Sequence, residues 1–465
     1  MVAATIFVIL GVCGMAIDLG FMYNRRVELQ NLADATALAA AIELDGTPAG
    51  VTKARSSAAS VAAAFRYAYT RPVTWKDDAL RFGSSPARTG GWIPGSTANS
   101  TPGGLLFARV DTADLDATLG TVSTVFMNVL GAGRDSVLQG YAIAGRTGVK
   151  VAPLAICALS NQAIAPRTTG AGAADELVEL GFRRGISYDL MNLNPGGLTA
   201  ENFVINPFAP PGTTGTAGPT SLAIVGPYIC RGTMSIPRVL GGALTVARKF
   251  PLSSLVDQLN SRFELDLGNT CNRVMAPPDA NIKQYVYSSI SWMSTTPLAQ
   301  SAAMVDSAGG KLITIADASP SPVGSSAGMF GPLWSFARAV PYSAVVPGQP
   351  EPAAGYAPFP TSDWAKLYDP GKPSAGTYPG TVPYLGTDSA VYKAASTTVR
   401  AQYNRRVLNV ALLKCPVGAG TTVAATALGI GKFFMTVPAT TKTLHAEFAG
   451  LVSDEALGTS TGLFP

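Results

Sequence analysis

The sequence contains little charge and a single histidine. Charged residues make up 14% of the 465 residues, against about a quarter in an average soluble protein. The formal net charge is only +5, and lysine and arginine occur in pairs but not in longer clusters, so the composition predicts no nucleic-acid interface. With His445 as the one histidine and no Cys-x-x-Cys pair, the chain lacks the ligand set and spacing of a zinc site.

Glycine and proline are abundant, with 49 and 34 residues, and together they exceed the average share of about 12%. Turn-forming residues at this density favour many short strands over a helical or doubly wound enzyme fold. We therefore expect an α+β protein, in which a long N-terminal apolar and amphipathic helix is followed by β-rich extracytoplasmic domains. The length is sufficient for two or three domains with cores of their own.

Five cysteines indicate the compartment. Cys13 lies in an apolar stretch and is expected to pack there as a small hydrophobic residue. The other four, Cys157, Cys230, Cys271 and Cys415, lack metal-site spacing and indicate two disulfides in an oxidising compartment, although four cysteines allow three pairings. We favour Cys157–Cys415, because VAPLAIC and VALLKC can form strands that lie side by side, and Cys230–Cys271, which closes a local loop. Four unpaired core thiols are the alternative.

The chain opens on an apolar run of membrane length. No charged residue occurs between Met1 and Ile17, and Asp18 is the one ionisable group before Asn24-Arg25-Arg26. As a helix, Met1 to Tyr23 would extend roughly 35 Å, enough to cross a bilayer. A cleaved signal peptide fits poorly, because no basic residue precedes the run and FMYNRR ends it. We expect a membrane anchor or a polymerisation helix, with Met1 either a truncated start or the residue left after a leader is removed.

Five residues of this helix are expected to serve assembly. Gly11 and Gly14 allow another helix to approach closely. Asp18 is expected to pair with Arg25, with Arg26 or with a neighbour's amino terminus, because an ionisable group at membrane depth needs a partner. We expect the apolar run as a whole to contact a membrane or neighbouring copies of the chain, and not the chain's own globular body.

The helical pattern continues to about residue 45, and residues 1–45 form the first predicted domain. Residues 24–45 are amphipathic and are expected to dock on the chain's own β-rich body or on adjacent copies. Residues 46–150 combine an alanine-rich helix with strand-like runs and predict a small α+β module. Residues 151–465 predict a β-rich, disulfide-bonded body with up to two subdomains. Its predicted strands include ISYDLMNL, ENFVINPF, SLAIVGPYIC and ALTVARKF, and LSSLVDQLNSRFEL is predicted to be a helix.

The stretch IDLGFMYNRRVELQNLADATALAAA resembles the N-terminal signature of the Flp pilus-assembly TadE/TadG-like proteins of the bacterial tight-adherence system. The resemblance covers residues 1–45, and a weaker one continues in VAPLAIC, RRVLNVALLKC and EFAGLV. It implies a non-enzymatic structural protein, without a cofactor, that builds or anchors pili at the cell envelope or cell surface. The implied partners are copies of the chain itself, other pilus-assembly proteins and the membrane.

A second hypothesis comes from KLITIADASPS. Asp317, Ser319 and Ser321 have the D-x-S-x-S spacing of the metal-ion-dependent adhesion site of von Willebrand A domains, which some larger TadG-like proteins carry. The alternative function is therefore a monomeric envelope adhesin that binds a divalent metal. Pro320 and Pro322 oppose the helix that should follow, which favours a proline-rich turn over a metal site.

A third pattern is that of a hydrolase. Gly324 to Gly328 match G-x-S-x-G around Ser326, and Asp363 or Asp369 followed by His445 would complete the order Ser, Asp, His. The nucleophile elbow needs a strand directly before it and a helix directly after it, and SPSPV and GMFGP supply neither. We therefore expect no catalytic activity, and we expect His445 to be a surface or edge residue.

Overall fold

The computed structural model describes two compact units. Unit 1 comprises Met1–Gly148 together with Asp454–Pro465, and unit 2 comprises Val149–Ser453. This division differs from the three ranges taken from the sequence, because the N-terminal helix shares a core with the module that follows it and the last strand returns to that module. The structure describes all residues except 1, 69, 103, 130–133, 170–171, 213–220, 266–269, 286–303, 307–310, 314–331, 347–348, 350, 369–377, 397–399, 460 and 465.

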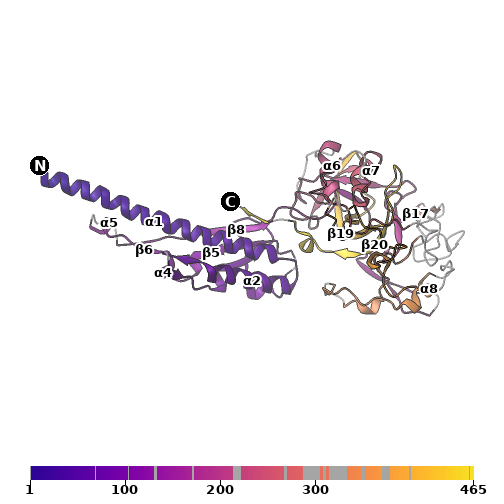
Figure 1. The fold of residues 1–465 in the computed structure, drawn as a ribbon, viewed down its shortest axis with the longest axis horizontal. Helices are drawn as coiled ribbons and strands as arrows, with labels where there is room; N and C mark the ends of the chain where they lie inside the picture. Colours follow the sequence, from indigo (N-terminus) through magenta and orange to yellow (C-terminus); the bar gives the residue numbers. More distant parts are fainter. Residues whose placement is uncertain are drawn as a thin grey trace. The chain divides into compact units, whose positions relative to one another are not determined.

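Unit 1 is built on two helices and an antiparallel five-stranded sheet (Figure 1). The strand order in that sheet is β21-β8-β5-β3-β4. The elements of unit 1, with η for 3₁₀ helices, are α1 (Val2–Glu43), α2 (Pro48–Ala64), β1 (Arg66–Tyr67), β2 (Arg71–Pro72), η1 (Asp77–Ala79), β3 (Leu80–Gly83), β4 (Ile93–Pro94), α3 (Gly95–Ala98), β5 (Phe107–Asp111), η2 (Thr112–Asp114), α4 (Ala117–Gly120), β6 (Thr121–Ser123), α5 (Phe126–Val129), β7 (Asp135–Val137), β8 (Tyr141–Arg146), η11 (Glu455–Leu457) and β21 (Thr461–Phe464).

Local chemistry explains how α1 ends and α2 begins. Gly46 follows α1 with a φ of 79°, a left-handed conformation that favours glycine. Thr47 then caps α2, because its side chain accepts a hydrogen bond from the Gly50 N–H, and Pro48 occupies the first helical turn, where no N–H is needed. The chain therefore reverses sharply, and α2 packs against the second half of α1.

The core of unit 1 is rich in alanine. Small side chains on α1 and α2 let the two helices approach each other and one face of the sheet, where Leu80, Phe82 and Val110 complete the core. The buried alanines of the two helices are Ala33, Ala37, Ala40, Ala41, Ala54 and Ala58. The sequence predicts that the second half of the N-terminal helix docks on the chain's own β-rich body, residues 151–465, or on adjacent copies. In the structure it packs on α2 and on the sheet of unit 1, which lie in the predicted small α+β module.

Unit 2 contains a seven-stranded sheet in the order β13-β20-β19-β15-β14-β9-β18. Because β19 pairs with β18 as well as with β15, five of these strands close into a ring. The elements of unit 2 are β9 (Leu154–Cys157), β10 (Ile164–Arg167), β11 (Glu176–Glu179), β12 (Phe182–Arg183), β13 (Ser187–Asp189), β14 (Asn202–Ile205), α6 (Leu222–Arg231), β15 (Ala243–Arg248), α7 (Leu252–Asn260), η3 (Ser261–Phe263), β16 (Met304–Asp306), β17 (Lys311–Ile313), η8 (Tyr342–Ala344), η9 (Thr361–Asp363), α8 (Trp364–Leu367), η10 (Pro383–Leu385), β18 (Val407–Leu413), β19 (Thr422–Met435) and β20 (His445–Val452).

One predicted strand is wrong. SLAIVGPYIC forms the helix α6 and not a strand, because its buried residues, Val225, Gly226, Ile229 and Cys230, recur at the spacing of a helix face. Short apolar runs fit a buried strand or a buried helix equally well, which is why the sequence pattern misled. The predicted helix at LSSLVDQLNSRFEL is present as α7 and η3.

The structure contains the two disulfides that the sequence favoured. Cys157 ends β9 and Cys415 follows β18, and these two strands run parallel with Leu413 in register with Cys157. The second disulfide joins Cys230, at the end of α6, to Cys271. Cys13 is a free and exposed cysteine.

Candidate functional site

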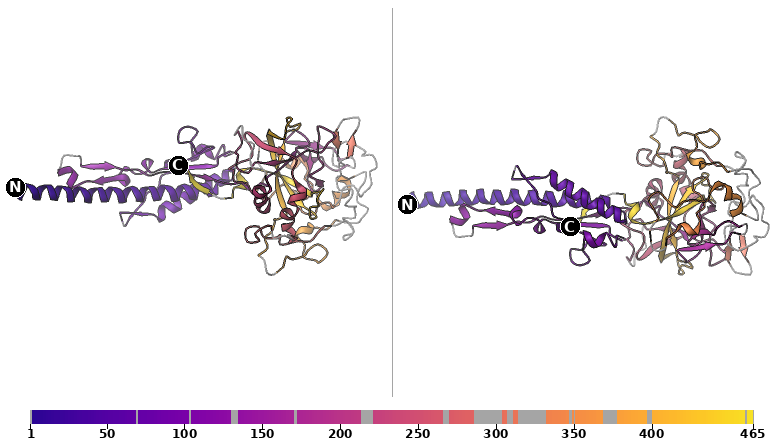
Figure 2. Two further views of the ribbon diagram at one scale, coloured as in Figure 1. Left: turned by 90° about the horizontal axis from the view of Figure 1, so that it is seen from above. Right: turned by 90° about the horizontal axis from the view of Figure 1, so that it is seen from below.

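The two halves of α1 have opposite environments. From Leu29 to Ala41 the helix buries one stripe against α2 and the sheet. Between Ile9 and Val27, by contrast, its large apolar side chains are exposed. Figure 2 shows this half of α1 as the part of the indigo helix that leads to the N-terminus. The exposed apolar side chains in this half are Ile9, Val12, Met15, Ile17, Leu19, Phe21, Tyr23 and Val27. Among the residues that the structure describes, no helix is both long enough and apolar enough to cross a membrane.

A segment of unit 1 clasps the first half of α1 along one narrow stripe. This clasp consists of β6, α5 and β7, within residues 121–137, and it lies beside α1 in Figure 1. Its central contact is Asp18, which is 2% exposed and accepts hydrogen bonds from three successive backbone N–H groups. The Oδ1 atom lies 3.2 Å from the Val125 nitrogen, and Oδ2 lies 2.8 Å and 2.7 Å from those of Phe126 and Met127. The carboxylate therefore satisfies the free N–H groups that begin α5.

Gly14 lies one turn before Asp18 on the same stripe and is also buried. A Cβ atom added there would come within 2.3 Å of the Phe126 ring, so only glycine allows the clasp to approach this closely. Gly11, one turn earlier, is half-buried. Of the two glycines predicted to allow close helix contacts, Gly14 packs against the clasp of its own chain.

Two expectations about this helix need correction. Asp18 was expected to pair with an arginine or with a neighbour's amino terminus, but the backbone of the clasp supplies its partners. Arg25 instead pairs with Glu28 at 3.4 Å, donates to the Leu119 carbonyl and lies over the Tyr67 ring, while Arg26 is exposed. The expectation that the apolar run does not contact its own unit is therefore wrong on the Gly14–Asp18 stripe.

The other predicted site residues do not assemble into a site that the structure describes. Asp317, Ser319, Ser321, Ser326 and Asp369 lie outside the described residues. Asp363 forms a salt bridge of 2.7 Å with Lys366. His445 lies on β20 in register with Asp189 of β13, is half-buried, and has its pKa lowered by desolvation. The expected surface or edge position of His445 is therefore only partly right, because β20 has strands on both sides.

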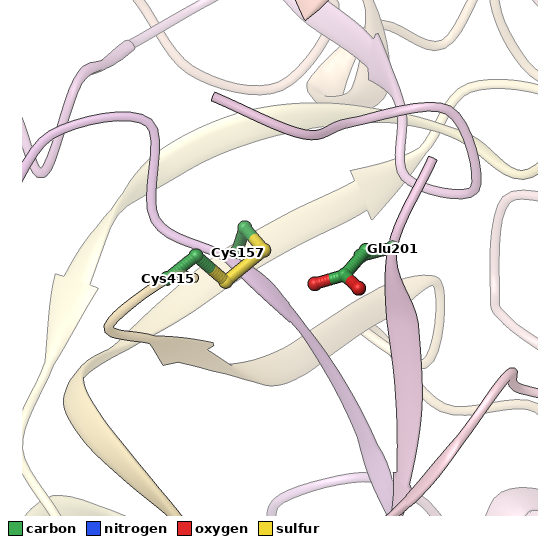
Figure 3. A group of neighbouring side chains, drawn as sticks. All are labelled: Cys157, Glu201 and Cys415. Atoms are coloured by element: carbon green, nitrogen blue, oxygen red, sulfur yellow. A yellow bond between two sulfur atoms is a disulfide. The ribbon is translucent and has the colours of Figure 1, made fainter. Parts of the chain in front are cut away.

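A cluster of Cys157, Cys415 and Glu201 has the composition of a metal site (Figure 3). Its two sulfur atoms are joined as a disulfide, so neither is the thiolate that a metal ion requires. The Glu201 carboxylate is engaged as well, because it forms a salt bridge of 2.7 Å with Arg248. The chemistry of this donor set does not fit a metal ion.

Sequence analysis missed the buried carboxylates of unit 2, among them Glu447. Glu447 on β20 is fully buried and accepts hydrogen bonds from the backbone N–H groups of Ser335, Phe336 and Ala337. Burial raises the pKa of Glu447 to about 7, because desolvation outweighs these three donors. The signal available in the sequence was a lone glutamate inside the apolar strand HAEFAGLV, whose partners lie more than a hundred residues earlier.

Comparison with known proteins found a similarity only for the N-terminal helix. No curated protein and no solved structure matches the chain significantly. The family described as "Putative Flp pilus-assembly TadE/G-like" matches residues 1–43, a range that corresponds to α1 and includes Gly14 and Asp18. Residues 1–43 of this chain are therefore similar to the TadE/G-like family of Flp pilus assembly.

Proposed function

We propose that this chain is a non-enzymatic structural protein of a Flp-type, tight-adherence pilus system, assembled through the first half of α1. The observation that carries the proposal is the exposed apolar surface of α1 between Ile9 and Val27, which is defined here as the assembly surface. The family match over residues 1–43 supports a role in pilus assembly, and the two disulfides support an envelope or extracellular location.

The assembly surface surrounds most of the helix. At 3.6 residues per turn, the exposed apolar side chains flank the Gly14–Asp18 stripe on both sides and also lie opposite it. On one flank lie Met15 and Leu19, on the opposite side Ile9 and Tyr23, and on the other flank Ile17 and Phe21. A helix that is apolar all round is usually buried all round. We therefore infer that several apolar neighbours, and not one groove, cover this half of α1.

The free energy gained by burying the assembly surface is large. Full burial of one large apolar side chain contributes about 1.5–3 kcal/mol, and the eight side chains of the assembly surface are already partly covered. Their complete burial would stabilise an assembly by on the order of 10 kcal/mol before the entropy of association is subtracted. The clasp assists this burial, because it satisfies the Asp18 carboxylate that would otherwise be desolvated without a partner.

We propose that the neighbours are the same helix in other copies of the chain, in a surface filament that can include other pilus-assembly proteins. A charged side chain on the assembly surface tests the proposal. Leu19→Glu should abolish incorporation into sedimentable pili, because a glutamate would be buried without a partner. Ile42→Glu is the matched control, since Ile42 lies on the same helix with 62% exposure against 50% for Leu19 and lies outside the assembly surface. Equal incorporation of both variants would contradict the proposal.

A second experiment distinguishes copies of the chain from lipid as the cover. Cys13 is a free, exposed thiol on the same half of α1 and can be cross-linked without introducing a new cysteine. A short bismaleimide reagent should convert intact filaments to covalent dimers, and Cys13→Ser should abolish this product. If no sedimentable assembly forms, and if the cross-linking yield in lipid vesicles falls as the protein is diluted with lipid, the protein would instead be a membrane-anchored monomer.

A further inference from the structure

The sheet of unit 1 has a second face, opposite α1 and α2, that presents arginine side chains. Because strand side chains alternate, Leu80 and Phe82 of β3 face the helices, whereas Arg81 faces away from them. Arg109 of β5 lies directly opposite Arg81 in the antiparallel register. Like charges directly opposite each other destabilise a sheet. This arrangement therefore carries an electrostatic cost that an anion would relieve.

Aromatic rings lie against two arginines of this face, Arg109 and Arg88. The Arg109 guanidinium lies 5.6 Å from the centre of the Trp92 ring and 5.9 Å from that of Tyr141, and Arg88 lies 5.0 Å from the Tyr141 ring. Trp92 can lie this close to the sheet because Gly83 has no side chain, and a Cβ atom there would be 3.0 Å from the indole. An arginine stacked on a ring keeps its N–H groups in one plane, available for paired hydrogen bonds to an oxyanion.

The arginines of this face have few partners in the described part of the chain. None of the described carboxylates forms a salt bridge with Arg81, Arg88 or Arg109. The Nε atoms of Arg81 and Arg109 and the hydroxyl of Tyr141 are buried without a hydrogen-bond partner among the described residues. Asp111 projects from the same face of β5 and keeps its negative charge while it accepts from the Ala113 N–H, but it forms no salt bridge with these arginines. The buried Nε and hydroxyl atoms are out of reach of a ligand in solution, but Arg81 and Arg109 are only half-buried and Arg88 is exposed, so the accessible parts of their guanidinium groups can donate to acceptor oxygens.

We propose that this arginine face binds an anionic polysaccharide through its carboxylate or sulfate groups. The three guanidinium groups extend over neighbouring strands and a loop, which favours a polymer with repeated oxyanions over a single small ion. Arginines already stack on Trp92 and Tyr141, which leaves less ring surface for the base stacking that single-stranded nucleic acid uses. The inference goes beyond the assembly role and does not depend on it.

Binding of the full-length protein to immobilised alginate and dextran sulfate tests the inference. We expect both polymers to bind at low ionic strength and to dissociate as NaCl is raised, because exposed charge pairs are screened. The double variant Arg81→Gln/Arg109→Gln should bind at least about tenfold more weakly, as the loss of charge-assisted hydrogen bonds predicts. The control Arg71→Gln/Arg134→Gln removes the same net charge from two exposed arginines of unit 1 and should bind as the unmodified protein does.

Three results would overturn the inference. The first is unchanged binding in the Arg81/Arg109 double variant, and the second is an equal loss in the control, which would assign binding to net charge. The third is tighter binding of polyglutamate or of oligothymidine than of either polysaccharide. If the double variant fails to fold, Arg109→Lys provides the test, because it keeps the charge but lacks the planar fork. It should weaken binding severalfold at an unchanged melting temperature.

Discussion

The contact between Asp18 and the clasp allows a quantitative test. In Asp18→Asn, one acceptor oxygen becomes an NH₂ group, so at most two of the three backbone hydrogen bonds survive, and these lose their charge assistance. A hydrogen bond to a charged group contributes about 1.5–3 kcal/mol, and a neutral one about 0.5–1.5 kcal/mol. One lost bond and two weakened bonds together predict that the free energy of opening the clasp falls by about 3 kcal/mol.

Amide hydrogen exchange measures this opening directly. For exchange that follows local opening, about 3 kcal/mol corresponds to about a 100-fold faster exchange at the N–H groups of residues 125–127. The exchange of α2 should not change, because its core contacts lie elsewhere. Asp34→Asn is the matched control on the same helix, since Asp34 bonds to Gln30 and not to the clasp.

The reasoning would be refuted if Asp18→Asn changed exchange at residues 125–127 by less than about threefold. Such a result would mean that packing of Phe126 on Gly14, and not the carboxylate, holds the clasp on α1. Gly14→Ala would then have the larger effect, because the added methyl group overlaps the Phe126 ring.

Two further predictions concern unit 2. The disulfides Cys157–Cys415 and Cys230–Cys271 close loops of 258 and 41 residues, so replacing the first pair with serines should lower the free energy of unfolding by roughly 1.5 kcal/mol more than replacing the second. Urea unfolding of both variants measures this, and the reverse order would contradict it. Because burial raises the pKa of Glu447 from 4.5 to about 7, its contribution to stability is present below pH 4.5 and lost as pH rises through 7, a change of about 3 kcal/mol. The difference in unfolding free energy between the unmodified protein and Glu447→Gln should show this pH dependence, and a difference that is constant with pH would contradict it.

The sequence predicted those features whose signals are local. The long N-terminal helix follows from an apolar run that passes without proline into an alanine-rich amphipathic stretch, and α1 spans both. The pairing of Cys157 with Cys415 followed from two similar strand-like runs that each end near a cysteine, and parallel pairing of β9 with β18 brings their ends together. Periodicity and composition were therefore sufficient to predict α1 and the Cys157–Cys415 disulfide of unit 2.

Features built from backbone groups far apart in the chain could not be predicted. The partners of Asp18 are N–H groups of residues 125–127, which every residue type except proline carries and which leave no mark in the sequence. The same holds for Glu447 and the N–H groups of residues 335–337. The arginine face could not be predicted for another reason. Arg81, Arg88 and Arg109 are isolated in the sequence, and only the strand register brings Arg81 and Arg109 together.

The position of β21 has a consequence for how the protein is made. Thr461–Phe464 pairs with β8, yet the whole of unit 2 is synthesised between these two strands. During synthesis from the N-terminus, unit 2 can fold as soon as its own residues emerge, whereas the edge of β8 in unit 1 stays open until β21 is made. A chain that is cut short, or that is cleaved and loses its last residues, would keep this edge unpaired and prone to association. Closure of the unit 1 sheet therefore requires a chain that is translated through residue 464.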